Sequence, residues 1–485
     1  MIQSSSVFWQ CVVGPKLYQT YPNLLPQDHQ FTHLYIKNLA EIVSDSVLLC
    51  LKLCFGIFRV VWPLCLWYYY QNDALIYDNG ISFLGHNFLS KYDFSLLHWE
   101  PDYIIDSSVV HQLPKVSITE VKLTLIERLF HHLILLLGYI GITIIGRRLI
   151  FPGSLQIIRY TRHRHLLDGR INLIVSYRAK RCLLRTADGN HIDTIFLDRR
   201  PSNTGQILVI TCEGNAGFYE VGCMMTAIRS NYSVFGWNRP GFGESSGCPS
   251  LLSEINAIDS IMRYVTEELH FPIDQIFLYA WSIGGYSACW TAVNYQNIRG
   301  LILDAIFDDI LPLVQRQMPL FTTKLVQTTI RYYFNLNNIQ LLQSYHGPFY
   351  LIRRTYDEIM NLIPNQPETN RVNTILLEIL PYRYPCIYKT DDETLSLLQQ
   401  YLLSNRKQRQ ILIDIYCSDN LQIETDAYQS DNPIAFYPCK FGESFSLEKR
   451  KCFAIFLIDQ YLIIFDSKHC TVLPQRYFSI PQRCV

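Results

Sequence analysis

The stretch that most constrains this chain runs from Gln275 to Trp290 and reads QIFLYAWSIGGYSACW. It begins with a short apolar run typical of a buried strand, and small and apolar residues with helical spacing follow Gly284. Ser282 stands between them, in the order small-x-Ser-x-Gly, with Ala280 where glycine is more usual. That order is typical of a nucleophile elbow, a sharp strand-to-helix turn that presents a reactive serine. A buried strand that merely ends in a serine explains it equally well, so the neighbouring segments must decide.

Composition excludes several classes of protein. With 485 residues, 49% of them hydrophobic, the chain is long enough for one large catalytic domain and a membrane or regulatory part. Lysine plus arginine number 42, as do aspartate plus glutamate, so no global field would recruit nucleic acid. The 15 cysteines are scattered without a C-x-x-C pair, which favours free thiols in a reducing compartment over disulfides or zinc. We expect no cofactor, no metal and no nucleic-acid partner.

The first 150 residues form a candidate membrane-anchoring region before a catalytic domain over residues 151–485. Residues 47–70 are apolar and aromatic over about the length of a membrane span, although two basic residues and a proline interrupt them. Residues 129–145 read LFHHLILLLGYIGITII and are shorter, so a buried or interfacial helix competes with a span there. The extreme N-terminus lacks the charged start, apolar core and cleavage site of a signal peptide.

The charges that flank the two candidate spans suggest an orientation. Between the spans lie eight acidic and four basic residues, whereas Arg147 to Arg170 contains six arginines and one aspartate. The positive-inside rule therefore predicts that the region after residue 146 faces the cytosol. The arginine cluster is suited to contact anionic lipid headgroups, and a solvated collar explains it equally well.

Strands and helices alternate from Arg178 onward. A hairpin is predicted first, because two strand-like runs flank a turn of Asp188, Gly189 and Asn190. The predicted strands are Cys182–Thr186, Ile192–Asp198, Gln206–Thr211, Ser233–Trp237, Gln275–Tyr279, Gly300–Leu303 and Pro348–Ile352, and the predicted helices lie near Gly217–Ser230, Leu251–Leu269 and Gly284–Tyr295. This order predicts a mostly parallel sheet with crossover helices and a site at the carboxyl ends of the strands.

Two loops follow these strands. The first, Cys212 to Gly217, reads CEGNAG, and its small residues would let a backbone N–H approach a developing oxyanion. Asn215 is the predicted donor, together with the N–H of Ile283, although an ordinary strand-to-helix loop explains the same glycines. The second loop, residues 237–247, lacks both the G-x-G-x-x-G spacing and a Walker lysine, so we interpret it as a turn bordering the pocket.

The order of residues along the chain indicates which histidine could act as the catalytic base. A serine nucleophile needs a base, and in α/β-hydrolases the order along the chain is serine, acid, histidine. Only His346 and His469 follow Ser282, and His346 precedes the last predicted strand. His469 is therefore the predicted base, with a solvated loop histidine as the alternative.

The acid is expected just after that last strand. Asp357 occupies this place, where a loop carboxylate can orient the imidazole and stabilise its charged form. Asp304, Asp308 and Asp309, which follow the preceding strand, are the alternatives unless they cap helices.

Two insertions interrupt the catalytic domain, at residues 310–345 and at about 361–448. The first is helical in pattern and has Met318, Leu320 and Phe321 as exposed apolar candidates. Insertions at these positions typically form a helical cap over the pocket, and an apolar cap favours an acyl chain. Packing against the sheet is the alternative for either insertion.

Several runs together resemble one family, the phosphatidylserine lipases of the α/β-hydrolase-domain-containing protein 16 family. They are VVGPKLY, GRRLIFPGS, CEGNAGFYEVG, YAWSIGG, LILDAIFDD, LIRRTYDEI and HCTVLP. The similarity is dense over residues 146–360 and sparser elsewhere, and the first 145 residues are the most diverged. It implies a membrane-anchored serine hydrolase at the endoplasmic reticulum, facing the cytosol, with a triad at Ser282, Asp357 and His469.

The activity implied is hydrolysis of phosphatidylserine to lysophosphatidylserine and a fatty acid, with monoacylglycerol as a further substrate. An acyl-protein thioesterase and a catalytically silent membrane scaffold are the alternatives. Arg353 and Arg354, beside the acid loop, are candidates to bind a phosphate or carboxylate of the headgroup. His163 and Asp168 have the H-x-x-x-x-D spacing of acyltransferases, which coincidence explains as well.

Overall fold

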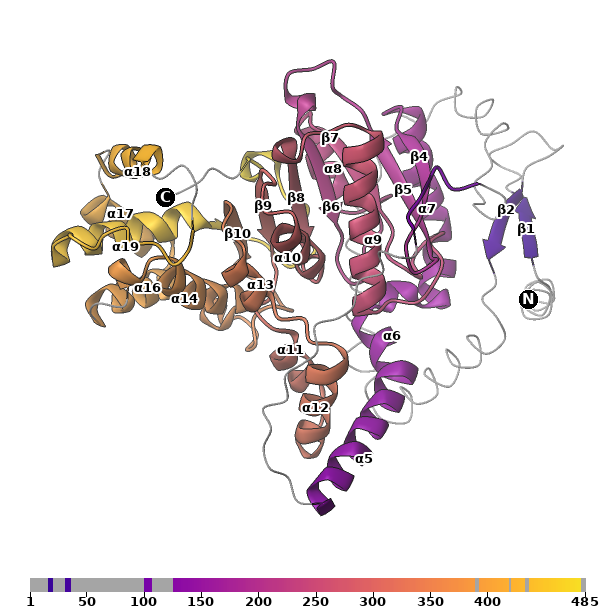
Figure 1. Ribbon diagram of the computed structural model, residues 1–485, viewed down its shortest axis with the longest axis horizontal. Helices are drawn as coiled ribbons and strands as arrows, with labels where there is room; N and C mark the ends of the chain where they lie inside the picture. Colours follow the sequence, from indigo (N-terminus) through magenta and orange to yellow (C-terminus); the bar gives the residue numbers. More distant parts are fainter. Residues whose placement is uncertain are drawn as a thin grey trace.

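The computed structural model describes residues 16–20, 31–35, 100–106, 125–388, 392–417, 420–431 and 436–480. The strands of its main sheet are β3 Tyr103–Ile104, β4 Lys180–Arg185, β5 His191–Leu197, β6 Leu208–Cys212, β7 Ser233–Trp237, β8 Ile276–Trp281, β9 Gly300–Asp304, β10 Phe349–Arg354 and β11 Leu462–Phe465. They lie in the order β11-β10-β9-β8-β6-β7-β5-β4-β3 (Figure 1). All neighbours from β7 to β11 are parallel, whereas β5 is antiparallel to both β4 and β7. This is the predicted α/β-hydrolase fold with its antiparallel opening.

Helices cover both faces of the sheet because alternate strand residues point to opposite sides. One face packs on α9 (Leu251–Arg263), α10 (Gly284–Asn294) and α13 (Asn338–Ser344), and the other on α7 (Gln156–Val175) and α8 (Met224–Arg229). In β8, for example, Leu278 belongs to the first core and its neighbours Phe277 and Tyr279 to the second. All three are at most 1% exposed. The fully buried central strands explain why their sequences read as continuous apolar runs.

Most predicted strands lie within two residues of the observed bounds, but one helix begins later than expected. The helix predicted from Gly217 starts only at Met224. The buried carboxylate of Glu213 accepts hydrogen bonds from the backbone N–H groups of Cys223 (3.0 Å) and Met224 (3.3 Å). These bonds satisfy donors that a helix start leaves open, so the helix begins there. Sequence reasoning also missed β11, a short strand that follows α19 (Leu447–Tyr461) without a turn.

The second insertion packs at the end of the sheet beside β10 (Figure 1). Its helices are α14 Arg371–Arg383, α15 Pro385–Tyr388, α16 Asp392–Leu403, α17 Arg406–Tyr416 and α18 Asn420–Asp431. Their apolar residues share one core with α19; Leu376 and Leu380 of α14, for example, are fully buried with Phe453 and Leu457 of α19. This segment is therefore an extension of the sheet's hydrophobic core.

A long apolar helix leaves the catalytic domain at one end (Figure 1). It comprises α5 (Leu125–Gly141), a π-helical turn (Ile142–Gly146) and α6 (Arg147–Ile150). Its 20-residue segment His131–Ile150 is long and apolar enough to cross a membrane by length and composition, and only 11% of its most apolar window is buried. Among the described residues this helix is therefore not buried in a soluble core, and a span and an interfacial helix remain the two predictions for it. The other candidate span, residues 47–70, lies outside the described residues.

The long helix packs against the first insertion. This insertion contains α11 (Ile310–Gln317) and α12 (Thr323–Tyr333), and α12 lies alongside α5 (Figure 1). The Tyr333 hydroxyl donates a hydrogen bond to the carbonyl of Leu135 at 3.1 Å. A Cβ on Gly138 would lie 2.3 Å from Thr329 Oγ1, so the absence of a side chain there permits close packing. We call α11 and α12 the cap.

Candidate active site

Ser282 stands at the turn between β8 and α10. Its backbone φ is +57°, a left-handed conformation that is rare for a residue with a side chain. The turn is held by a hydrogen bond from the Ser282 N–H to the Asp304 carbonyl (2.9 Å). A Cβ on Gly284 would lie 2.1 Å from the carbonyl oxygen of Cys212, so glycine is required there. Ala280 is fully buried in the core, which accommodates its methyl group.

The structure brings His469 and Asp357 together. His469 Nδ1 lies 2.8 Å from Asp357 Oδ2, and both side chains are buried. The other Asp357 oxygen accepts hydrogen bonds from the N–H groups of Ile359 (2.9 Å) and Met360 (2.8 Å), which hold the carboxylate in place. An acceptor at Nδ1 keeps the proton on that nitrogen and leaves Nε2 as a base.

His469 is also oriented by Trp281, the residue before the serine. The two rings lie 5.3 Å apart between centroids, and the indole N–H donates to the His469 carbonyl at 3.3 Å. Ser282 and His469 line one pocket, although no hydrogen bond joins their side chains in the part of the chain that the structure describes. Catalytic hydrogen bonds are often long in the absence of substrate.

The two predicted oxyanion donors border the same pocket. Asn215 and Ala216 follow β6, and Ile283 directly precedes α10. The first N–H groups of a helix have no partner within the helix and carry the positive end of its dipole, so this position favours a developing negative charge. Both predicted donors therefore line the same pocket as Ser282, and their role as donors stays a prediction.

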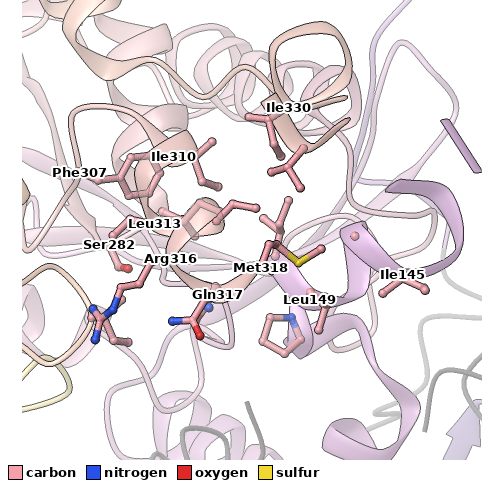
Figure 2. Close-up of a pocket in the computed structure, with 18 of the residues that line it drawn as sticks. Ile145, Leu149, Ser282, Phe307, Ile310, Leu313, Arg316, Gln317, Met318 and Ile330 are labelled. Atoms are coloured by element: carbon pink, nitrogen blue, oxygen red, sulfur yellow. The ribbon is translucent and has the colours of Figure 1, made fainter. Parts of the chain in front are cut away.

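The pocket itself has a volume of about 420 Å³ and is mostly apolar (Figure 2). Its walls come from three parts of the chain: the α5–α6 helix, the cap and the catalytic loops. Representative residues are Leu137, Ile142, Ile145 and Leu149 of the helix, Ile310, Leu313, Met318 and Ile330 of the cap, and Phe307 and Met360 of the loops. An apolar cavity of this kind suits an acyl chain.

The two insertions contribute differently to this pocket. Met318 lines it, whereas Leu320 and Phe321, at the tip between the cap helices, are each 90% exposed. No residue from 361 to 448 lines the pocket among those that the structure describes. The expectation that the second insertion covers the site is therefore wrong, because its apolar residues are used in the core beside β10.

The expected headgroup role of Arg353 and Arg354 is also wrong. Both are 2% exposed and neither lines the pocket. Arg354 pairs with Asp304 through two hydrogen bonds of 2.8 and 2.7 Å. Arg353 donates to Asn373 Oδ1 at 2.7 Å, and burial lowers the pKa of its guanidinium to about 10. Both arginines belong to the buried strand β10 and not to the loop after it, so their side chains lie inside the protein.

The alternative acids have other partners. Asp304 is the partner of Arg354, Asp308 pairs with Arg371, and Asp309 caps α11 by accepting from the N–H of Leu311 at 2.8 Å. None of the three lines the pocket.

The arginine cluster is divided between core and surface, because Arg162 and Arg170 are buried while Arg147, Arg148 and Arg159 are partly exposed. The residues with the H-x-x-x-x-D spacing lie apart on their helix. Arg170 is 5% exposed and pairs with Glu220 and Asp193, so it is part of the core rather than a solvated collar. His163 and Asp168 lie on one continuous helix, α7, where five residues correspond to about 140° of rotation, so they do not share a face.

Sequence reasoning missed the contribution of the α5–α6 helix to the site. The signal was present: residues 138, 142, 145 and 149 line the pocket with the three- and four-residue spacing of one helix face. Arg162, Arg316 and Glu358, the charged residues of the pocket lining, were missed as well. No local pattern distinguishes them from surface charges.

Comparison with known proteins is consistent with this geometry. The family model described as the phosphatidylserine lipase ABHD16 N-terminal domain matches residues 6–96, and that of the alpha/beta hydrolase fold matches residues 207–365. The N-terminal region is thus more similar to the family than expected.

Individual proteins are also similar to this chain. The phosphatidylserine lipases ABHD16A of Bos taurus and Homo sapiens are each 40% identical over 354 residues, which is 71% of this chain and 62% of each relative. The chain therefore matches less than two thirds of their length. An uncharacterized Caenorhabditis elegans protein is 34% identical over 82% of this chain and 75% of its own. A Pyrococcus furiosus esterase structure shares 15% identity over 43% of this chain and 80% of its own, with a TM-score of 0.34, too low to support an argument.

The buried ion pair beneath the elbow yields the first prediction. Arg354→Met leaves the Asp304 carboxylate buried without its partner, so we expect the free energy of unfolding to fall by about 3 kcal/mol or more. Chemical denaturation measures this. The double variant Arg354→Met/Asp304→Leu should recover part of the loss, and equal stability of the single variant and the wild type would contradict the assigned role.

Glu213 yields a pH-dependent prediction. Burial raises the pKa of this carboxyl from 4.5 to about 7, despite the two N–H groups that favour its charged form. A raised folded pKa stabilises the protein at low pH, and this stabilisation is lost as the pH rises from about 4.5 to 7. Glu213→Gln removes the titration. Between pH 5 and pH 8 the variant should therefore gain about 2 kcal/mol relative to the wild type, measured by denaturation at both pH values; parallel pH profiles would contradict this.

Proposed function

Because this chain belongs to the phosphatidylserine lipase ABHD16 family, as its similarity to ABHD16A shows, we propose that it is a membrane-associated serine hydrolase of phosphatidylserine. It cleaves one acyl ester of this phospholipid to release a fatty acid and lysophosphatidylserine. The observation that carries the proposal is the position of Ser282, which lies in an apolar pocket beside the paired His469 and Asp357.

The reaction proceeds through an acyl-enzyme. Ser282 Oγ attacks the ester carbonyl carbon while its proton passes to Nε2 of His469, and Asp357 stabilises the resulting imidazolium. The N–H groups of Asn215 and Ile283 hold the oxyanion. The carbon–oxygen bond to the glycerol breaks, and the leaving oxygen takes the proton from His469. A water molecule, deprotonated by the same histidine, then releases the fatty acid and restores the serine.

The apolar wall favours a lipid substrate over a small polar ester. The acyl chain lies between the α5–α6 helix and the cap, so a lipid can reach Ser282 from the hydrocarbon region of a bilayer without crossing water. Monoacylglycerol, which presents the same ester and chain, is a further substrate of this site.

Two other functions remain as alternatives. An acyl-protein thioesterase would use the same triad, since the thioester carbonyl is attacked in the same way. A catalytically silent scaffold is disfavoured, because serine, histidine and acid are all present and a pocket leads to them.

We place the enzyme at the membrane of the endoplasmic reticulum with the catalytic domain in the cytosol. The long apolar helix supports membrane association, and the arginines that follow it support the cytosolic side. Ten cysteines are free thiols in the described part of the chain, which fits a reducing compartment. Leu320 and Phe321, exposed at the tip of the cap that packs on α5, extend the apolar surface toward the same bilayer.

The catalytic assignment is tested with Ser282→Ala. We expect complete loss of labelling by a fluorophosphonate probe and of fatty-acid release from phosphatidylserine, because Ser282 is the nucleophile of the proposed mechanism. The neighbouring Cys470 thiol does not replace it, since burial raises the pKa of that thiol well above its ordinary value. Mass spectrometry of the purified protein with mixed phospholipids and a palmitoylated peptide separates the lipase from the thioesterase. Ser287→Ala, on the same helix but outside the pocket, is the control. Labelling that persists in Ser282→Ala would remove the assignment.

The membrane contact of the cap is tested with Leu320→Ser/Phe321→Ser. Fully burying each side chain is worth about 1.5–3 kcal/mol, so we expect hydrolysis of phosphatidylserine in vesicles to fall roughly tenfold or more. Hydrolysis of a dissolved short-chain ester should not change. Leu403→Ser/Ile415→Ser removes two other exposed apolar side chains, each 64% exposed and on helices away from the cap (Figure 1), and serves as the control. Equal losses in both double variants would contradict a specific contact.

A further inference from the structure

The charged residues that line the pocket are few and have complementary signs. They are Arg162, Arg316 and Glu358. Apart from the titratable side chains of His469 and Cys470, the other lining residues are uncharged, and most of them are apolar. Placing charges in an apolar pocket is unfavourable unless a partner compensates them. The three residues together carry a net charge of +1, and they border the same cavity as Ser282.

Glu358 has an oxygen that the protein leaves unsatisfied. Its Oε2 accepts a weak hydrogen bond from the backbone N–H of His469 at 3.3 Å, while its Oε1 is buried and has no hydrogen-bond partner. Buried polar atoms are nearly always hydrogen-bonded, so an unsatisfied carboxylate oxygen beside a candidate catalytic histidine calls for a donor from outside the protein. A cationic donor suits a carboxylate best, because charge-assisted hydrogen bonds are the stronger ones, and here it would lie in the pocket that Ser282 lines.

Arg316 supplies the opposite charge from the cap. Its Nη1 donates to the carbonyl of Asn361 at 2.7 Å, which fixes the guanidinium over the loop that carries Asp357 and Glu358. No ion pair joins Arg316 to Glu358 in the described ranges, so the two charges do not cancel each other. In Figure 2 the Arg316 side chain lies at the same end of the pocket as Ser282, whereas Ile145 and Leu149 lie toward the other end.

We propose that Arg316 and Glu358 form the headgroup subsite of the enzyme and select phosphatidylserine by its charges, an inference that rests on the proposed function. The phosphoserine headgroup carries a phosphate, an ammonium and a carboxylate, with a net charge of −1. Arg316 binds the phosphate, which is the anionic group closest to the esters along the glycerol. Glu358 Oε1 accepts a hydrogen bond from the ammonium.

This arrangement discriminates between headgroups by chemistry. A choline headgroup has a quaternary ammonium that cannot donate a hydrogen bond to Glu358. Phosphatidylglycerol has the same net charge as phosphatidylserine but lacks a cation, so it leaves Glu358 Oε1 unsatisfied. Monoacylglycerol has no phosphate for Arg316. A site that hydrogen-bonds a substrate group rejects an analogue lacking it, because its own buried polar group then stays unpaired.

The test measures competition between two substrates in the same mixed vesicles, so that differences in protein stability cancel. Glu358→Gln should lower the preference for phosphatidylserine over phosphatidylglycerol roughly tenfold, and Arg316→Gln should lower the preference for phosphatidylserine over monoacylglycerol by a similar factor, as expected for one charge-assisted hydrogen bond. Lys324→Gln, an exposed charge on the cap outside the pocket, should change neither ratio. Unchanged ratios in both pocket variants would overturn the proposal.

A second measurement on the wild-type protein keeps the test decisive if a variant does not fold. Excess glycerophosphoserine, which has the headgroup but no acyl chain, should slow fluorophosphonate labelling of Ser282 several-fold, whereas glycerophosphocholine should not. Equal protection by the two compounds overturns the subsite. Protection by glycerophosphoserine without hydrolysis of phosphatidylserine would instead support the subsite and remove the proposed reaction.

Discussion

The site depends on the tight packing of one turn against the carboxyl ends of three neighbouring strands. Ser282 adopts its left-handed backbone because its N–H is held by the carbonyl of Asp304 at the end of β9. Gly284 lies so close to the Cys212 carbonyl at the end of β6 that no side chain fits. Asp304 in turn is held by Arg354 at the end of β10. The strained turn persists because its contacts with the buried strands around it hold the backbone of Ser282 in this conformation.

The pocket beside Ser282 is formed by segments that are far apart along the chain. The apolar helix that could cross a membrane forms one wall, and the cap forms another, while Ser282 and His469 lie between them. Close contact at Gly138 and the hydrogen bond from Tyr333 connect helix and cap. Because the apolar helix also lines the pocket, the proposed lipid substrate would have an apolar route to Ser282, and the same helix contributes to the apolar character of the site.

Much of the fold and of the candidate site was predictable from the sequence. Buried parallel strands have continuous apolar sequences, so the strands of the sheet were predictable. In this fold the catalytic residues follow the chain order serine, acid, histidine, and few residues after Ser282 satisfy that order, so Asp357 and His469 were predictable as well. The headgroup role predicted for Arg353 and Arg354 was wrong because the sequence does not show whether a residue at the end of a strand belongs to the strand or to the following loop. The second insertion was misplaced since its apolar helices fit a cap and a core equally well.

What the sequence by itself determined is the set of local patterns: the strand-turn-helix around Ser282, the glycines that allow close backbone approach, and the apolar helix over residues 131–150. These follow from side-chain period and backbone sterics, which act within a few residues. Tertiary structure alone decided that this helix lines the pocket, that Arg316 and Glu358 line the same pocket as the serine, and that Arg354 is buried with Asp304. Those relations join residues that are far apart along the chain, and only the packing of the sheet and its helices brings them together.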